Sequence, residues 1–152
     1  MDILKESKIN GAIINLGGNI LTYGNKPDNS SFKIAVEKPF DTSQPFITLA
    51  IKNNKSVVTS GIYERYFTNN DKIYHHILNT STGYPIENNL YSVTIIGPSS
   101  ETADSLSTLF LIMGYEKAEK ELQNYPDYSA IYIFDDYMVK YSSNFNKTII
   151  HN

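Results

Sequence analysis

The stretch SVTIIGPSSETADSLSTLFLIMG, residues 92–114, decides how this chain is organised. Residues 92–96 alternate and are rich in β-branched side chains, which is typical of a strand. The GPSS segment that follows breaks this pattern, and its Ser99 or Ser100 can cap the N-terminus of a helix. Apolar residues then recur at helical spacing until Gly114, a typical helix stop. The stretch therefore predicts a strand followed directly by a helix.

Asp104 and Thr108 lie one turn apart in this expected helix. Residues at this spacing project from neighbouring points of one helix face, so a carboxylate and a hydroxyl would present two oxygens to the same region. Hard cations such as Mg²⁺ take oxygen ligands. The D-x-x-x-T pattern is also common by chance, and an ordinary solvated helix face is its more common explanation. The spacing alone leaves both interpretations open.

The composition indicates one folded domain covering residues 1–152. A hydrophobic content of 41% with 12% aromatic residues favours a globular fold over disorder. The net charge of -3 gives no reason to expect nucleic acid as a partner. The absence of cysteine excludes a disulfide partner and thiolate metal sites. Residues 1–10 are polar and show no signal peptide, and no run reaches the roughly 18 apolar residues that span a membrane.

Turn residues and alternating patterns predict further elements on both sides of the central stretch. We expect strands at 12–16, 20–23, 32–36, 46–51, 56–59, 62–68, 72–78, 129–134 and 137–141, and helices at 2–7 and 116–124. The loop at 79–89 is longer than most connections, which marks it as a candidate functional segment. Together these elements predict an α+β fold, with a mostly antiparallel sheet and two adjacent helices.

Two adjacent histidines, His75 and His76, stand at the end of an expected strand. Neighbouring strand residues point to opposite faces, so one ring should face the core or a cleft and the other solvent. A histidine beside a long loop is well placed for acid–base chemistry. A packed or exposed histidine without a chemical role is the alternative.

Three glycine-containing turns could contact an anionic ligand. Gly17 and Gly18 precede Asn19 in a turn where the backbone could approach a phosphate closely. TSG at 59–61 and TGYP at 82–85 offer hydroxyl and backbone N–H donors. A G-G-N turn is far more often an ordinary hairpin turn, and the other two are equally what any turn looks like.

The order of these motifs is more specific than any of them alone. They are INLGGN at 14–19, VTSGIYER at 58–65, HHILNTSTGYP at 75–85, SVTIIGP at 92–98, ADSLST at 103–108 and MG at 113–114. This series resembles the C-terminal half of the ApbE family, the FAD:protein FMN transferases. The resemblance covers nearly the whole chain. It departs from the family pattern at Asn79 and Thr80, where a carboxylate and a proline are usual, and at Ser81, where a basic residue is usual.

The resemblance implies an ApbE-like fold and a flavin-transfer reaction. Family members bind FAD and Mg²⁺ and move FMN onto a threonine of a target flavoprotein, releasing AMP. By this resemblance Asp104 and Thr108 are metal ligands, and His76 takes part in catalysis. The residues that it places in the flavin-nucleotide site are Gly17, Gly18, Asn19, Thr59, Ser60, Gly61, Thr82 and Gly83.

The family enzymes are about twice as long as this chain. The resemblance therefore implies that part of the flavin pocket, and a backbone carbonyl ligand of the metal, come from residues upstream of Met1. It also implies a membrane-anchored or extracytoplasmic location in bacteria. Three interpretations follow: a transferase domain, a non-catalytic flavin- or nucleotide-binding module, or a half-enzyme completed by another chain.

Overall fold

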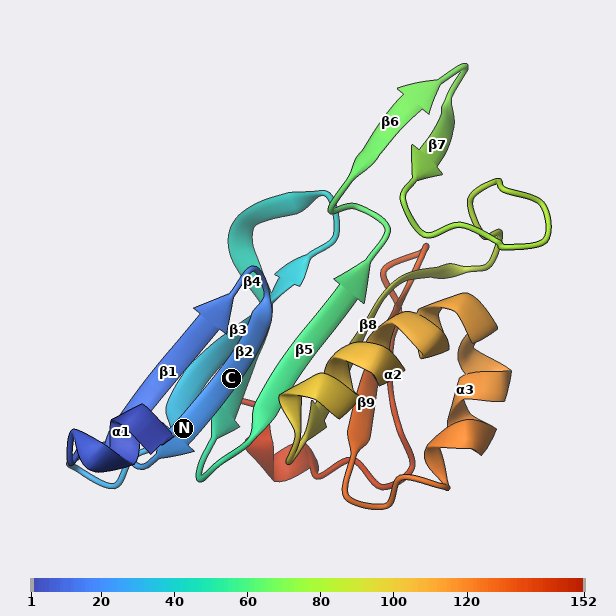
Figure 1. Cartoon of the computed structure of the whole chain (residues 1–152). Coiled ribbons are helices and arrows are strands. Elements are labelled where there is room, and N and C mark those ends of the chain that lie inside the picture. Colours follow the sequence, from blue (N-terminus) through green and yellow to red (C-terminus); the bar gives the residue numbers. More distant parts are fainter. Residues whose placement is uncertain (1, 152) are drawn as a thin grey trace.

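The computed structural model, which describes residues 2–151, is built on a six-stranded antiparallel sheet (Figure 1). Its strands, in spatial order, are β1 (Gly11–Leu16), β2 (Asn19–Gly24), β5 (Ser56–Gly61), β8 (Leu90–Gly97), β9 (Ser129–Phe134) and β10 (Val139–Tyr141). Each neighbouring pair is antiparallel. Residues 1 and 152 of the expected domain lie outside the described part. The α+β class and the mostly antiparallel sheet are confirmed.

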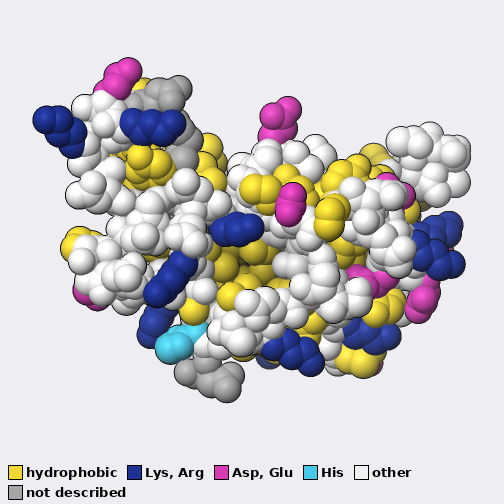
Figure 2. Space-filling view, turned by 90° about the horizontal axis from the view of Figure 1, so that it is seen from below, with side chains coloured by type: hydrophobic (Ala, Val, Ile, Leu, Met, Phe, Trp, Pro, Cys, Tyr) yellow, Lys and Arg dark blue, Asp and Glu magenta, His cyan; other side chains and the backbone are white. Residues whose placement is uncertain are grey.

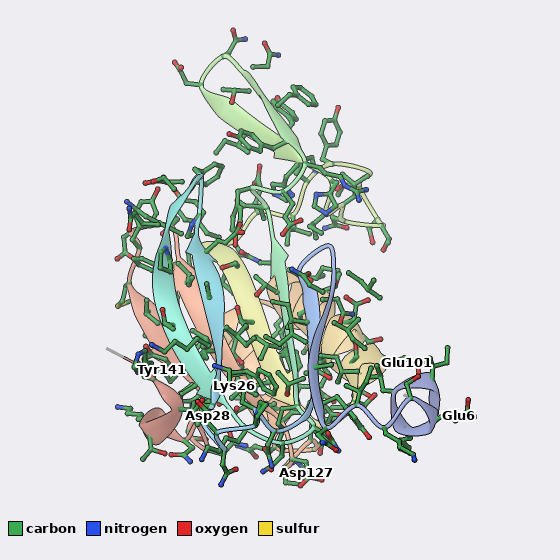
Figure 3. All side chains as sticks on the ribbon, turned by 90° about the vertical axis from the view of Figure 1, so that its left-hand side faces the viewer. Glu6, Lys26, Asp28, Glu101, Asp127 and Tyr141 are labelled. Carbon is green, nitrogen blue, oxygen red and sulfur yellow. The ribbon has the colours of Figure 1, made fainter. Side chains whose placement is uncertain are left out.

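Two layers cover the faces of this sheet. Helices α2 (Ser100–Met113) and α3 (Tyr115–Leu122) lie on one face, and the hairpin β3 (Phe32–Lys38)–β4 (Asp41–Ile51) lies on the other. Figure 3 shows the layers from the side, with Glu101 of α2 on one side of the sheet and the loop that leads to β3 on the other. The two short helical segments are α1 (Asp2–Glu6) and η1 (Lys147–Ile149).

Strand β8 is buried on both faces, which is why it does not show a clean alternation of polar and apolar residues. Val93 and Ile95 pack in the core under α2, together with Leu106 and Phe110. Ile96, one residue further along the strand, packs in a second core against β3 and β4. The central stretch of the sequence therefore takes part in both cores.

A hairpin of β6 (Tyr66–Asn69) and β7 (Lys72–His75) projects from the body of the molecule (Figure 1). We call this hairpin and the following residues 76–89 the arm. Both strands of the hairpin are shorter than the sequence predicts. Residues 62–65 form a turn because Ile62 packs against the α2 core and Tyr63 lies over Gly61, which directs the chain out of the sheet.

Other boundaries also differ from the prediction. Strand β4 begins before Pro45, which is accommodated where the β3–β4 register shifts. The turn before β10 is longer than expected because Tyr137 takes a positive φ of 64°. The segment η1 is not predicted by any periodic pattern. None of the helices formed by residues 2–151 is long and apolar enough to cross a membrane.

Phe110 is the best probe of the α2–sheet interface because its side chain is fully buried there. We expect Phe110→Ala to lower the free energy of unfolding by about 3–5 kcal/mol, through lost burial and the cavity left behind. Leu109→Ala, at the neighbouring side chain that is 41% exposed, is the control and should cost much less. Urea denaturation measures both, and equal losses would contradict this packing.

Candidate functional site

The Gly17–Gly18 turn joins β1 to β2 as a two-residue hairpin connection. Both glycines have positive φ, 63° and 90°, a conformation that residues with a Cβ rarely adopt. The Gly18 N–H donates to Asn15 Oδ1 at 3.1 Å. Asn19 is the first residue of β2, and its Oδ1 accepts a hydrogen bond from Ser100 Oγ at 2.5 Å. The turn is thereby attached to the start of α2.

Thr59 and Ser60 are consecutive residues of β5 and point to opposite faces of the sheet. Ser60 faces α2, where its Oγ lies 2.7 Å from Ser107 Oγ and 2.9 Å from Thr108 Oγ1. Thr59 faces the β3–β4 layer, and its Oγ1 lies 2.8 Å from Thr94 Oγ1. The predicted TSG motif therefore serves two different environments.

Asp104 and Thr108 lie one turn apart on α2, as the sequence predicts. The Asp104 side chain is exposed and Thr108 is half-buried beside Ser60. Among residues 2–151, no three His, Asp or Glu side chains gather closely enough to hold a metal ion. A cation at Asp104 would therefore draw its other ligands from hydroxyl, water or phosphate oxygens. A carboxylate next to a hydroxyl is an oxygen donor pair that fits Mg²⁺.

A cavity of about 410 Å³ opens on the β3–β4 side of the sheet. Gly17, Gly18 and Thr59 line it together with Tyr63. Burial raises the pKa of Tyr63 to about 12, so its phenol is neutral at physiological pH. A Cβ on Gly61 would lie 2.6 Å from the Tyr63 ring, so glycine permits this close approach.

A second cavity, of about 470 Å³, lies elsewhere and contains none of the predicted site residues. It is lined by residues of the β4–β5 turn, such as Lys52 and Lys55, and by Tyr128. Seen from below, the molecule shows hydrophobic side chains gathered in the middle of its underside, with Lys and Arg side chains around them (Figure 2). The larger of the two cavities therefore does not coincide with the predicted site residues.

The two histidines point to opposite sides of the arm, as the strand alternation predicts. His75 is 7% exposed, and burial lowers its pKa below the usual 6.5. His76 is exposed, with its Nδ1 3.2 Å from the carbonyl oxygen of Arg65. The ring that faces solvent is the one to which the family resemblance gives a catalytic role.

Thr82 and Gly83 belong to a tight turn in the arm. The Gly83 N–H donates to the Asn79 carbonyl at 2.8 Å, and Gly83 has a positive φ of 72°. Asn88 Nδ2 donates to the Leu111 carbonyl at 2.6 Å, which attaches the arm to the C-terminal end of α2. The hydrogen bonds formed within residues 2–151 do not link Thr82 or Gly83 to Asp104.

Comparison with known proteins identifies the family of this chain. The model of the ApbE family matches residues 1–132. The chain belongs to the ApbE family. It is 41% identical over 132 residues to the FAD:protein FMN transferase of Klebsiella pneumoniae, covering 87% of this chain and 40% of that protein. It is 34% identical over 152 residues to the FAD:protein FMN transferase of Treponema pallidum, covering 94% of this chain and 42% of that protein.

Solved ApbE structures share the fold. The ApbE protein of Thermotoga maritima superposes with a TM-score of 0.82 at 30% identity, covering 98% of this chain and 48% of that one. The flavinyl transferase ApbE of Pseudomonas stutzeri superposes with a TM-score of 0.76 at 28% identity, over 97% of this chain and 46% of that one. The chain thus spans between two fifths and one half of the length of these relatives.

Two serines that form hydrogen bonds with site residues around α2 are not among the predicted site residues. Ser100 bonds Asn19, and Ser107 lies fully buried between Ser60 and the helix backbone. The signal for Ser107 is its position, four residues after Ala103 and three before Phe110, within the apolar stripe of the helix. A small polar residue on a buried stripe indicates a specific hydrogen-bond partner.

The buried His75 makes the stability of this ApbE chain depend on pH. Its pKa is lower in the folded chain than the usual 6.5, so the unfolded chain takes up the proton first as the pH falls. We therefore expect the melting temperature of the wild type to fall as the pH is lowered below about 6.5. The melting temperature of His75→Gln should fall less steeply over the same range. His76→Gln, at the exposed neighbour, is the control and should follow the wild type. Parallel pH profiles for all three chains would contradict the assignment.

Proposed function

We propose that this chain is the part of an ApbE flavin transferase that carries metal and flavin ligands, and that it serves to move FMN from FAD onto a threonine of a target flavoprotein. One observation carries the proposal. Asn19, Ser60 and Thr108 come from three separate motifs, and all three side chains are hydrogen-bonded at α2. The family name shared by the relatives supports the same activity.

The proposed reaction is a phosphoryl transfer. The oxygen of the acceptor threonine forms a bond to the FMN phosphorus, the P–O bond of the pyrophosphate bridge breaks, and AMP leaves with the bridging oxygen. A threonine hydroxyl is a weak nucleophile and must lose its proton, so a nearby base helps. His76 is our candidate for accepting this proton or for positioning the phosphate. Its exposure on the arm leaves it accessible to an acceptor protein.

Asp104 and Thr108 would hold Mg²⁺, and their oxygen donors fit this ion. When bound there, Mg²⁺ would stabilise the negative charge that develops on the phosphoryl oxygens. Gly17, Gly18 and Thr59 line the cavity on the opposite, β3–β4 side of the sheet and are the candidates for contacts with FAD. Gly61, Thr82 and Gly83 complete the flavin-nucleotide site that the family pattern implies.

A half-enzyme completed by a further polypeptide is the second candidate. The chain covers less than half of the length of its relatives. Strand β1 stands at the edge of the sheet with Leu16 75% and Ile13 46% exposed. An apolar edge strand of this kind is suited to pairing with or packing against another segment.

We expect His76→Ala to abolish FMN transfer while FAD still binds, because the substitution removes the proton acceptor and leaves the cavity unchanged. Mass spectrometry of a candidate acceptor, incubated with the chain, FAD and Mg²⁺, measures the FMN adduct. His151→Ala, at another exposed histidine, is the matched control. Unchanged turnover of the His76→Ala chain would remove His76 from the mechanism.

Asp104→Asn tests the metal ligand. Loss of the negative charge should weaken binding of Mn²⁺, used in place of Mg²⁺, by about tenfold or more. Glu101→Gln removes an exposed carboxylate from the first turn of the same helix and should leave the affinity unchanged. Electron paramagnetic resonance of free Mn²⁺ provides the affinities. Equal affinities of the two variants would contradict a metal site at Asp104.

A further inference from the structure

Three hydroxyl groups between β5 and α2 are linked by hydrogen bonds, and we call them the hydroxyl series. Thr108 Oγ1 lies 2.9 Å from Ser60 Oγ, which lies 2.7 Å from Ser107 Oγ. Ser107 Oγ in turn donates to the backbone carbonyl of Asp104 at 2.9 Å. The hydroxyl series thus begins at Thr108, one proposed metal ligand, and ends on the backbone of Asp104, the other.

The direction of each hydrogen bond in the hydroxyl series follows from its last acceptor, the Asp104 carbonyl. A carbonyl oxygen can only accept, so the single hydroxyl hydrogen of Ser107 is used on Asp104. Ser107 must then accept from Ser60, because it has no second hydrogen to give. Ser60 has in turn used its own hydrogen, so it accepts from Thr108. The hydrogen of Thr108 therefore points inward, toward Ser60.

This direction determines what Thr108 offers on its outer side. With its hydrogen used on Ser60, Oγ1 has only lone pairs left, and lone pairs are what a cation requires. A threonine in a helix has an alternative rotamer in which Oγ1 bonds the carbonyl four residues earlier. For Thr108 that carbonyl belongs to Asp104, where the helical N–H of Thr108 and the Ser107 hydroxyl already use both lone pairs.

Burial makes the arrangement persistent. Ser107 is fully buried and Ser60 is half-buried under the helix. A buried hydroxyl that loses its partner pays the cost of desolvation without compensation, so reversed or broken arrangements are disfavoured.

We propose that Ser60 and Ser107 are positioning residues that orient Thr108 as a lone-pair donor toward a divalent cation. The inference rests on the metal site of the proposed function. Ser60 acts on the cation only by orienting Thr108. Ser107 acts through Ser60, a role that the family motif does not give it.

The first test needs no metal. Three-bond NMR couplings to the Thr108 methyl carbon report its χ1 rotamer in the metal-free protein. We expect one rotamer in the wild type and averaging over rotamers in Ser60→Ala and Ser107→Ala. Ser105→Ala is the matched control. The Ser105 hydroxyl also donates to a helix carbonyl, that of Glu101, but Ser105 is exposed and does not belong to the hydroxyl series. A single unchanged rotamer in both serine variants, with circular dichroism showing that they are folded, would overturn the inference.

The second test measures Mn²⁺ affinity by electron paramagnetic resonance. Ser60→Ala should weaken binding about 10- to 100-fold, as expected for a residue that orients a ligand, while Ser105→Ala matches the wild type. In a Thr108→Val background Ser60→Ala should cause no further loss, because its effect passes through Thr108. An equal loss in both backgrounds, or no loss in either, would overturn the inference.

The two proposals fail in different ways. If Asp104→Asn abolishes Mn²⁺ binding and Ser60→Ala does not, the metal site stands and the positioning role is overturned. If the wild type binds no Mn²⁺, the metal site of the proposed function fails, and the positioning role toward a cation fails with it, whatever rotamer Thr108 adopts.

Discussion

The packing of α2 across β5 and β8 determines where the candidate site residues lie relative to one another. Leu106 and Phe110 fix the helix over the sheet through apolar burial. Hydrogen bonds of Ser107 with Ser60 and of Ser100 with Asn19 then fix its position along the sheet. Because the helix is held at both points, Asp104 and Thr108 face a defined region of the molecule. Any shift of α2 would separate the motifs that the proposed chemistry needs together.

Alternation along β5 distributes the predicted site residues over two faces of one sheet. Ser60 belongs to the α2 side, whereas Thr59 lines the cavity under β3 and β4. The two-residue Gly17–Gly18 turn lies at the edge of the same cavity, while Asn19 contacts α2. His76 belongs to neither group, since it sits on the projecting arm. A ligand that engages all of these residues would have to be extended, as a dinucleotide such as FAD is.

Short-range patterns account for much of what could be predicted from the sequence. The tight Gly17–Gly18 turn, the Ser99 cap and the Asp104–Thr108 spacing depend only on neighbouring residues. The arm and the hydrogen bonding of Ser107 depend on contacts between segments far apart in the chain, such as Ser107 with Ser60. Periodicity assigns a residue to a face but does not identify the element that covers it. The order of the motifs, which periodicity does not use, carries the ApbE resemblance, and the family match supports it.

Under the proposed function, Asp104, Thr108 and the Gly17–Gly18 turn together form a metal-dependent flavin-nucleotide site. Fluorescence titration of FAD with the purified chain, in excess Mg²⁺ and again in excess chelator, tests this site. We expect saturable FAD binding that is markedly tighter with Mg²⁺. FAD binding of equal affinity under both conditions, or no binding in either, would contradict it.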